Sequence, residues 1–69
     1  MLKTKYSTRH GGPYDRGSAD SYYGRKFDPH YYKGDTYSSP RVECGHNTDS
    51  WFAYKAGYDD NEASSNFKY

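Results

Sequence analysis

The sequence predicts a small, mainly α-helical protein, a two-helix hairpin whose helices are joined by a long irregular connection and whose termini are flexible. Two segments carry helix start and stop signals, one before residue 27 and one after residue 47, and turn-forming residues fill the stretch between them. At 69 residues the chain forms one domain at most, in the size range where a hydrophobic core alone is marginal.

Aromatic rings replace aliphatic side chains as the apolar material of this chain. It contains ten tyrosines, whereas Leu2 and Val42 are its only leucine and valine and isoleucine is absent. A tyrosine ring buries roughly 150–250 Å² and its hydroxyl needs a partner, so tyrosine suits half-exposed surfaces and interfaces. The composition therefore predicts a binding protein.

Residues 1–13 are expected to form a flexible N-terminal arm. They end in Gly11, Gly12 and Pro13, a cluster that breaks regular structure. The helical domain with its long internal loop is expected over residues 14–64, and residues 65–69 form a tail. Both ends are expected to be loose because the burial of a few rings offsets the ordering entropy of only a small nucleus.

The first helix is expected over residues 14–26. Asp15 or Ser18 is its candidate N-cap, because short polar side chains accept hydrogen bonds from the first backbone N–H groups of a helix. Gly24 is well placed to end the helix in the left-handed conformation, with Pro29 shortly beyond it.

Residues 27–47 are expected to form the connection. Asp28, Pro29 and Pro40 favour turns, and aromatic residues are embedded among them. Only Arg41–Glu43 is expected to form a short extended segment. A connection of about twenty residues is long for a compact domain, so it is expected to be functional or mobile.

The second helix carries the strongest signal. Thr48 or Asp49 can cap its N-terminus, and Trp51, Tyr54 and Tyr58 recur at helical spacing. These three rings therefore share one helix face.

Gly57 lies inside this helix, where glycine is roughly 1 kcal/mol less favourable than alanine. Close approach of another backbone is the natural reason for it. We therefore expect Gly17 and Ser18 of the first helix to meet Ala53 and Gly57 of the second.

The net charge is close to zero but unevenly distributed. The chain carries a formal charge of +1; residues 1–42 hold eight basic and four acidic residues, and residues 43–69 hold two basic and five acidic ones. This asymmetry fits a basic face for an anionic partner, an acidic face for a basic one, two halves that attract each other, or an ordinary solvated surface.

Localisation follows from the cysteine content and from the absence of long apolar runs. Cys44 is the single cysteine, so no internal disulfide forms, and a lone thiol fits a reducing cytoplasm. No apolar run approaches the roughly 18–20 residues of a membrane span, and the N-terminus lacks the apolar region of a signal peptide. A soluble cytoplasmic protein without a membrane partner is expected.

Basic residues alternate with aromatic ones in the first half of the chain, which is what phosphate contacts combined with base stacking need. The residues expected to contact nucleic acid are Arg16, Arg25, Lys26, Lys33, Tyr22, Tyr23 and Tyr31. Against this interpretation, a dedicated nucleic-acid binder is usually markedly basic. In the alternative, Tyr22 and Tyr23 belong to the core and the arginines line its edge.

A protein partner is the other binding hypothesis, because tyrosine, tryptophan and arginine dominate interface energetics. The residues expected at such an interface are Trp51, Tyr54, Tyr58, Asp59, Asp60 and Glu62. This acidic, aromatic helix could occupy a basic cleft on a host enzyme, or it could simply present a solvated acidic face.

Metal binding and catalysis are not expected. Cys44, His46, His10 and His30 are potential zinc ligands, but their spacing matches no zinc finger or ribbon. A nucleophile formed by Cys44 and His46 would need a pocket and an orienting third group. The protein is therefore predicted to be no enzyme and to hold no metal or other cofactor.

Four short motifs in this order resemble the ribosome modulation factor pattern: Arg16-Gly17, then Gly24-Arg25, then Pro29-His30, and finally the segment from Tyr54 to Tyr58. The resemblance covers about half of the chain, whose connection is longer and which has Asp28 where that family has cysteine. That family consists of short two-helix proteins that bind the small ribosomal subunit and promote inactive ribosome pairs. The resemblance implies binding to the ribosome.

The segments 16–25, 28–31 and 53–63 are similar to those of small proteins found in phage and prophage genomes. This second resemblance implies a virus-encoded accessory protein in the cytoplasm of a bacterial host. The expected function is therefore non-enzymatic binding of a host target, with the ribosome or other RNA as first choice and inhibition or modulation of a host protein as the alternative.

Overall fold

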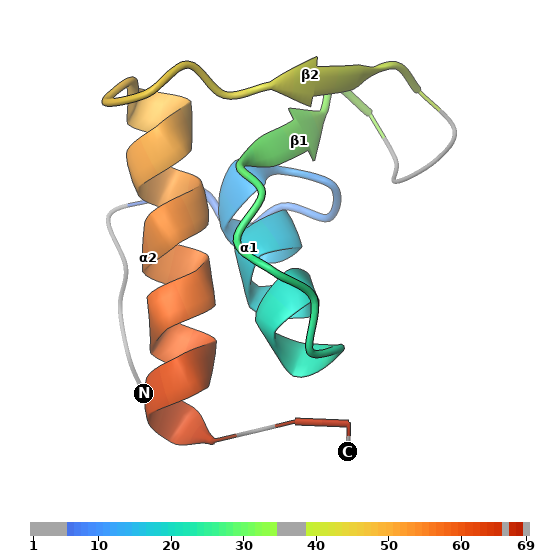
Figure 1. The fold of residues 1–69 in the computed structure, drawn as a ribbon. Coiled ribbons are helices and arrows are strands. Elements are labelled where there is room, and N and C mark those ends of the chain that lie inside the picture. Colours follow the sequence, from blue (N-terminus) through green and yellow to red (C-terminus); the bar gives the residue numbers. More distant parts are fainter. Residues whose placement is uncertain (1–5, 35–38, 66, 69) are drawn as a thin grey trace.

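The computed structural model describes residues 6–34, 39–65, 67 and 68. Two helices, α1 (Pro13–Tyr22) and α2 (Asp49–Ser64), pack against each other and are joined by a connection that contains two strands, β1 (His30–Tyr32) and β2 (Arg41–Glu43) (Figure 1). The predicted fold class, mainly α with a long connection, is confirmed.

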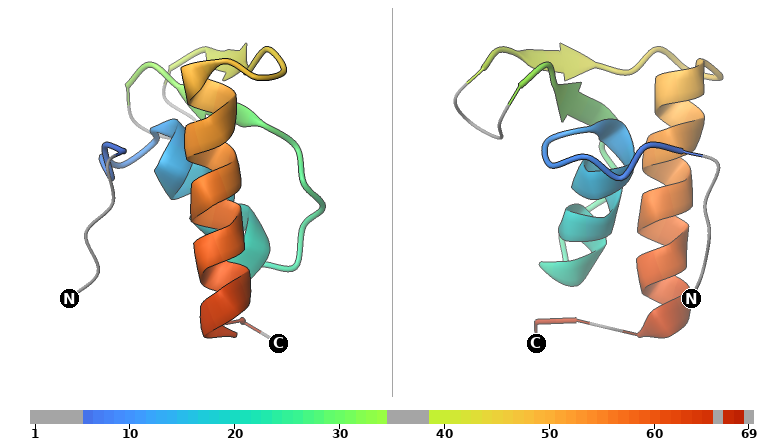
Figure 2. Two further views of the ribbon diagram at one scale, coloured as in Figure 1. Left: turned by 90° about the vertical axis from the view of Figure 1, so that its left-hand side faces the viewer. Right: turned by 180° about the vertical axis from the view of Figure 1, so that it is seen from behind.

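Both helices begin beside the small sheet and run away from it (Figures 1 and 2). The segment after α1 returns alongside that helix to β1, and the chain then crosses through β2 to the start of α2. This path places the returning segment and the sheet around α1, where they form one side of the site described below.

The N-terminus of α1 differs from the expectation. The helix begins at Pro13 with Gly12 as N-cap, so Asp15 and Ser18, the predicted caps, lie inside it. Proline suits the first helical position, because its fixed φ is helical and the N–H that it lacks would have no partner there. Asp15 still satisfies a backbone donor, since its Oδ2 accepts a hydrogen bond from the Gly11 N–H at 2.9 Å.

The C-terminus of α1 ends on glycine, as predicted. Gly24 has φ +71°, its N–H donates to the Ser21 carbonyl at 3.0 Å, and the Arg25 N–H donates to the Asp20 carbonyl at 2.8 Å. These two bonds form a Schellman motif, which satisfies the last carbonyls of a helix. The predicted range 14–26 extends four residues past the end of the helix at Tyr22, because the backbone turns at Gly24.

Thr48 caps α2, as one of the two predicted alternatives. Its side chain accepts a hydrogen bond from the Trp51 N–H at 3.3 Å. Ser65, in the left-handed conformation, ends the helix. Among the described residues, neither helix combines the length and the apolar character that crossing a bilayer would require.

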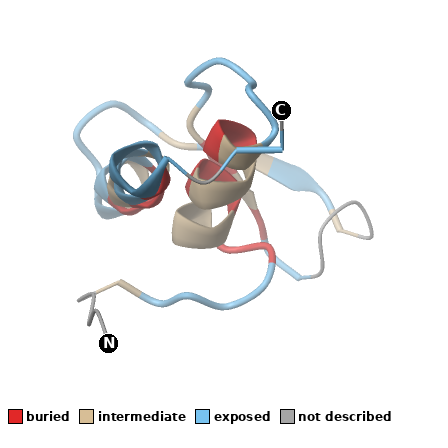
Figure 3. Ribbon diagram, turned by 90° about the horizontal axis from the view of Figure 1, so that it is seen from below, coloured by how far each residue is buried: buried red, intermediate tan, exposed pale blue. Residues whose placement is uncertain are grey.

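The two helices meet along small residues, as the glycine pattern predicts. Figure 3 colours the buried residues of both helices red. The buried residues of α1 are Arg16, Gly17, Asp20 and Ser21, and those of α2 are Ala53, Tyr54, Gly57 and Asn61. Because the side chains at the crossing are small, the helices lie close together. Longer polar side chains on either side of the crossing can therefore reach the facing helix.

The strands pair antiparallel, with His30 opposite Glu43 and Tyr32 opposite Arg41. The segment Arg41–Glu43 was expected to be extended, but its pairing with β1 was not predicted. His30 and Tyr32 are buried and Tyr31 between them is half-buried, the alternation that a strand with one face on a core shows.

The predicted arm, residues 1–13, is partly described. Residues 1–5 lie outside the described residues. Farther along, the Tyr32 N–H donates to the Gly11 carbonyl and an Arg9 Nη2 donates to the Tyr32 carbonyl, both at 2.8 Å. In the predicted tail, residues 66 and 69 lie outside the described residues, and the Lys68 N–H donates to the Tyr22 carbonyl at 2.8 Å. Both segments thus contact the helical domain.

Candidate functional site

The interior between the helices and β1 is largely polar. Tyr54 is completely buried, and Tyr32 and Ala53 are the other buried hydrophobic residues among those described. Five further described side chains are buried and polar: Arg16, Asp20, Ser21, His30 and Asn61. Because a buried polar group is costly unless it is paired, this interior requires an organised network.

Asp20 is the centre of that network, at 3% exposure. Its carboxylate accepts a hydrogen bond from the Tyr54 hydroxyl and lies 3.7 Å from an Arg16 nitrogen, 3.5 Å from an Arg25 nitrogen and 3.8 Å from His30 Nδ1. The carboxylate is thus surrounded by donors, which compensates for its removal from water.

Two partners of Asp20 are themselves fixed by neighbouring backbone. His30 Nδ1 donates to the Asp28 carbonyl at 2.7 Å, and the Asp28 N–H donates to the Tyr54 hydroxyl at 3.2 Å. Burial, together with the hydrogen bond to Asp20, raises the pKa of Tyr54. Tyr54 therefore stays protonated and acts as a fixed hydrogen-bond donor.

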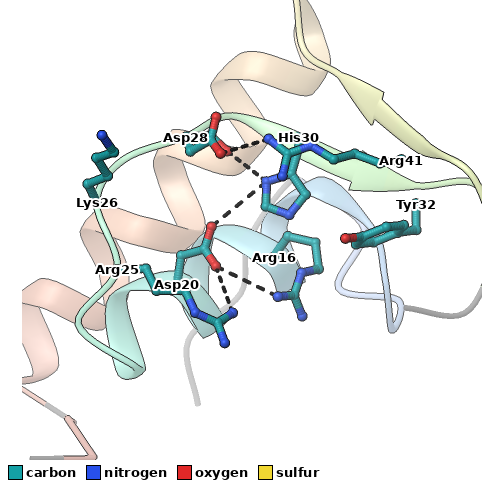
Figure 4. Close-up of a pocket in the computed structure, with 8 residues that line it drawn as sticks. All are labelled: Arg16, Asp20, Arg25, Lys26, Asp28, His30, Tyr32 and Arg41. Carbon is teal, nitrogen blue, oxygen red and sulfur yellow. Dashed lines mark hydrogen bonds and ion pairs between the residues drawn. The ribbon is translucent and has the colours of Figure 1, made fainter. Parts of the chain in front are cut away.

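A cavity of about 190 Å³ opens beside this network, between α1, the segment that follows it and the sheet (Figure 4). Its lining residues are Arg16, Asp20, Arg25, Lys26, Asp28, His30, Tyr32 and Arg41. We call it the basic pocket, because four of these eight side chains are cationic at neutral pH and two are carboxylates.

The β2 side of the basic pocket is neutralised by its own carboxylates. Arg41 donates to Asp28 at 2.7 Å and also to Glu43. The hydrogen bonds from this guanidinium lower the pKa of both Asp28 and Glu43, and they raise the pKa of Arg41 in return. Arg41 is therefore held as a structural element of the wall.

The α1 side keeps an excess of positive charge. Arg16 lies at the floor with its side chain 8% exposed, and Arg25 lies at the rim with its side chain 51% exposed. Both face the single carboxylate of Asp20. Lys26 is exposed, and no ion pair involving it occurs within the described part of the chain. Arg16 and Arg25 therefore share one carboxylate, and Lys26 adds a third cation to the lining.

The structure brings some of the predicted nucleic-acid contacts together. Arg16, Arg25 and Lys26 all line the basic pocket. Tyr23 lies next to it, 43% exposed, with the Arg25 guanidinium 5.1 Å and the Lys68 ammonium 5.2 Å from its ring centre.

The other predicted contacts lie apart from the pocket. Tyr22 makes an edge-to-face contact with Tyr23 at 5.0 Å. Tyr31 and Lys33 do not line the pocket, because Tyr31 lies on the strand face opposite His30 and Tyr32.

Five lining residues were not predicted: Asp20, Asp28, His30, Tyr32 and Arg41. The sequence contained one indication of Asp20, because Asp20 follows Arg16 by four residues and therefore shares its helix face. A second indication, of His30 and Tyr32, was their alternation about Tyr31, once that segment is taken as a strand.

The residues predicted at a protein interface do not form one surface. Tyr54 is fully buried, so the prediction that it contacts a partner is wrong; its hydroxyl pairs with Asp20 and its ring packs against Phe27. The Tyr58 hydroxyl donates to the Arg25 carbonyl at 2.7 Å and so holds the segment after α1.

The acidic residues of α2 have partners of their own. Asp60 accepts from the Tyr14 hydroxyl, and Glu62 accepts from the Ser21 hydroxyl, each at 2.5 Å. Asp59 pairs with Lys55 one turn earlier, at 2.6 Å. Two of the three carboxylates thus fasten α2 to α1.

An aromatic patch remains exposed near the start of α2, formed by Phe27, Trp51 and Phe52. The Trp51 ring makes edge-to-face contacts with Phe27 at 5.9 Å and with Phe52 at 5.2 Å. Phe27 and Phe52 are 39% and 42% exposed. Of the residues predicted at a protein interface, only Trp51 belongs to this patch.

Among the described residues, no three His, Cys, Asp or Glu side chains are grouped so as to hold a metal ion. Cys44 is half-buried, and burial raises the pKa of its thiol to about 11. What the pocket offers is fixed positive charge, suited to binding an anion. Comparisons of this chain with protein-family models, with curated proteins and with solved structures find no match.

Proposed function

We propose that this protein binds RNA, with the α1 side of the basic pocket holding phosphate and Tyr23 beside it offering a surface for a base. The observation that carries the proposal is the grouping of Arg16, Arg25 and Lys26 around one cavity, in which Arg16 and Arg25 share a single carboxylate, Asp20. Arginine forks match phosphate oxygens, and such contacts supply most of the affinity of a nucleic-acid binder.

Tyr23 supports the proposal because an exposed ring flanked by two cations is the combination that single-stranded RNA needs. Base stacking on an aromatic side chain contributes about 1–3 kcal/mol and tolerates any base. Arg25 links the two features, since it lines the basic pocket and also lies over the Tyr23 ring. A phosphate and its neighbouring base could thus be held together.

Ribosomal RNA of a bacterial host is the RNA that we propose. Arg16 and Arg25 are the two arginines of the motifs that resemble ribosome modulation factor, and both line the basic pocket. The similarity to phage and prophage proteins supports a bacterial cytoplasm as the place of action. The protein acts in this proposal by occupying RNA, without catalysis.

Fluorescence anisotropy with a labelled single-stranded RNA tests the proposal. With about three phosphate contacts, the affinity should fall roughly 20-fold between about 50 and 200 mM salt. The double variant Arg25→Ala with Lys26→Ala should bind at least about tenfold more weakly and show a shallower salt dependence.

The matched control is Lys33→Ala with Lys55→Ala, which removes the same charge from side chains that do not line the pocket. This control should bind almost as the unchanged protein does. Equal weakening by both double variants would place the RNA elsewhere, and absence of RNA binding in the unchanged protein, at low salt, would refute the function.

A protein partner is the second candidate, and the exposed aromatic patch of Phe27, Trp51 and Phe52 favours it. Aromatic side chains dominate the energy of protein interfaces. In a pull-down from bacterial lysate, a host protein retained after ribonuclease treatment and lost with Phe52→Ser would support this candidate. If capture is instead lost after ribonuclease treatment and requires Arg25, the result would support RNA binding.

A further inference from the structure

We infer that the basic pocket selects a terminal phosphate, a phosphate monoester, over the internal phosphodiesters of an RNA chain. This inference rests on the proposed RNA binding and makes it specific: the RNA is held by a phosphorylated end. Three features of the pocket support it: the shape of the floor, the balance of charge in the lining, and the paired charges on the β2 side.

The floor of the pocket is closed by side chains that are themselves almost buried. The exposed fractions are 8% for Arg16, 4% for Asp20 and 5% for His30. An internal phosphate carries a nucleoside on each side, and neither could continue through this closed floor. A terminal phosphate enters with a single substituent, which suits a recess of about 190 Å³.

The charge of the pocket lining matches a dianion. The lining contains four cationic side chains and two carboxylates, which leaves an excess of two positive charges. A phosphate monoester carries about −1.5 to −2 charges at pH 7. A phosphodiester carries one, so it would leave part of the excess uncompensated. The monoester is therefore the better electrostatic complement.

The β2 side disfavours a chain that crosses the pocket. There Arg41 is paired with two carboxylates, Asp28 and Glu43, so this wall is already neutralised. An RNA chain that crossed the cavity would therefore gain little on this side, whereas a chain that ends in the pocket leaves on the α1 side, toward Tyr23. The uneven distribution of charge in the pocket thus favours an RNA chain that leaves on the α1 side.

The floor cation is positioned independently of any ligand. The Arg16 guanidinium lies 5.9 Å from the Tyr32 ring centre and 3.7 Å from Asp20. Because these contacts already hold the guanidinium in place, little ordering of Arg16 is needed when a phosphate enters. Arg25 and Lys26, which are exposed, supply the adjustable contacts.

The experiment compares three single-stranded RNAs of one sequence with an internal fluorescent label: one with a 5′-phosphate, one with a 3′-phosphate, and one with hydroxyls at both ends. Anisotropy should show roughly tenfold tighter binding of at least one phosphorylated RNA than of the hydroxyl-ended RNA. A nucleoside monophosphate should compete, and the same nucleoside without phosphate should not.

Exposed side chains serve for the variants, because replacing the buried Arg16 endangers the fold. Arg25→Gln and Lys26→Gln should each reduce the preference for the phosphorylated end, whereas Lys33→Gln should keep it. A preference that survives in the variant with both pocket changes would overturn the assignment to this pocket.

The outcomes separate this inference from the function on which it rests. Equal binding of all three RNAs would overturn end selection and leave RNA binding intact. Binding of the nucleoside monophosphate, with no affinity for any RNA, would keep the monoester site and overturn RNA binding. Inorganic phosphate alone, titrated against the side-chain NMR signals of Arg16 and Arg25, distinguishes a site for any phosphate from one that also needs the nucleoside.

Discussion

Gly17 and Gly57 lie where α1 and α2 cross, each against the backbone of the other helix. A Cβ atom on Gly17 would lie 2.0 Å from the Tyr54 carbonyl oxygen, and a Cβ on Gly57 would lie 2.1 Å from the Tyr14 carbonyl oxygen. Both distances are far below van der Waals contact, so only glycine permits this approach. The approach in turn brings Tyr54 within hydrogen-bonding reach of Asp20.

Alanine at either glycine should destabilise the protein strongly. In an ordinary helix interior, replacing glycine with alanine stabilises by about 1 kcal/mol. Here the added methyl group meets backbone, which cannot rotate away, so Gly17→Ala and Gly57→Ala should each lower the free energy of unfolding by about 1–3 kcal/mol or more. Urea denaturation followed by circular dichroism measures the change.

Gly34→Ala is the control for this prediction. A Cβ at Gly34 would meet Ser39 at 3.5 Å, an ordinary contact, so the substitution should change stability little. If Gly17→Ala and Gly57→Ala were as stable as the control, the helices would not be in backbone contact.

The sequence carried enough information to predict the helices, their crossing and two of their ends. Glycine is unfavourable inside a helix, so Gly57 predicted that another backbone lies against it. Gly24 predicted the end of α1, and Thr48 was one of the two predicted caps of α2. In each case a local rule of backbone geometry decides the structure, and such rules act over only a few residues.

The polar interior was not predictable in the same way. Aspartate usually lies at the surface and histidine is intermediate, and Asp20 and His30 are buried here only because long-range folding supplies their partners. The pairing of His30–Tyr32 with Arg41–Glu43 likewise depends on a connection whose sequence has no strong strand pattern. Residues that are distant in the sequence but close in the fold therefore determine the burial of Asp20 and His30 and the pairing of the two strands.

Tyr54→Phe should destabilise the protein by about 1–3 kcal/mol, because it leaves buried hydrogen-bonding groups without their partner. The hydroxyl donates to Asp20 and accepts from the Asp28 N–H, and both bonds disappear in the variant. Denaturant unfolding measures the loss. Tyr23→Phe, at a ring that is 43% exposed, is the matched control and should stay within about 0.5 kcal/mol. Similar effects of the two substitutions would contradict the central role of Asp20.

Cys44 should react slowly in the folded protein. Burial raises the pKa of its thiol to about 11, and only the thiolate attacks a disulfide reagent. At pH 8 the folded chain should therefore react at least about tenfold more slowly than the chain unfolded in urea, where the pKa is about 8.5, even though a thiolate of higher pKa is the stronger nucleophile. The single cysteine makes the absorbance change unambiguous. Equal rates in the two states would show that the thiol is not shielded.

Tyr14 should make stability depend on pH in the alkaline range. Its hydrogen bond to Asp60 raises the pKa of Tyr14 to about 12, whereas an unfolded tyrosine has a pKa of about 10. Between these values the folded state holds a proton that the unfolded state has lost. The contribution of Tyr14 is therefore complete below about pH 10 and is lost as the pH rises through about 12.

The comparison that isolates this contribution is with Tyr14→Phe, because other tyrosines titrate in both proteins. The stability difference between the unchanged protein and the variant should be constant below about pH 10 and should shrink toward about pH 12, as ionisation removes the hydrogen bond. Asp60→Asn removes the carboxylate that raises the pKa, so the alkaline loss of stability should again be less steep. If the stability difference between the unchanged protein and Tyr14→Phe grew with pH, folding would have to lower the pKa of Tyr14. That is the reverse of what its hydrogen bond to Asp60 requires.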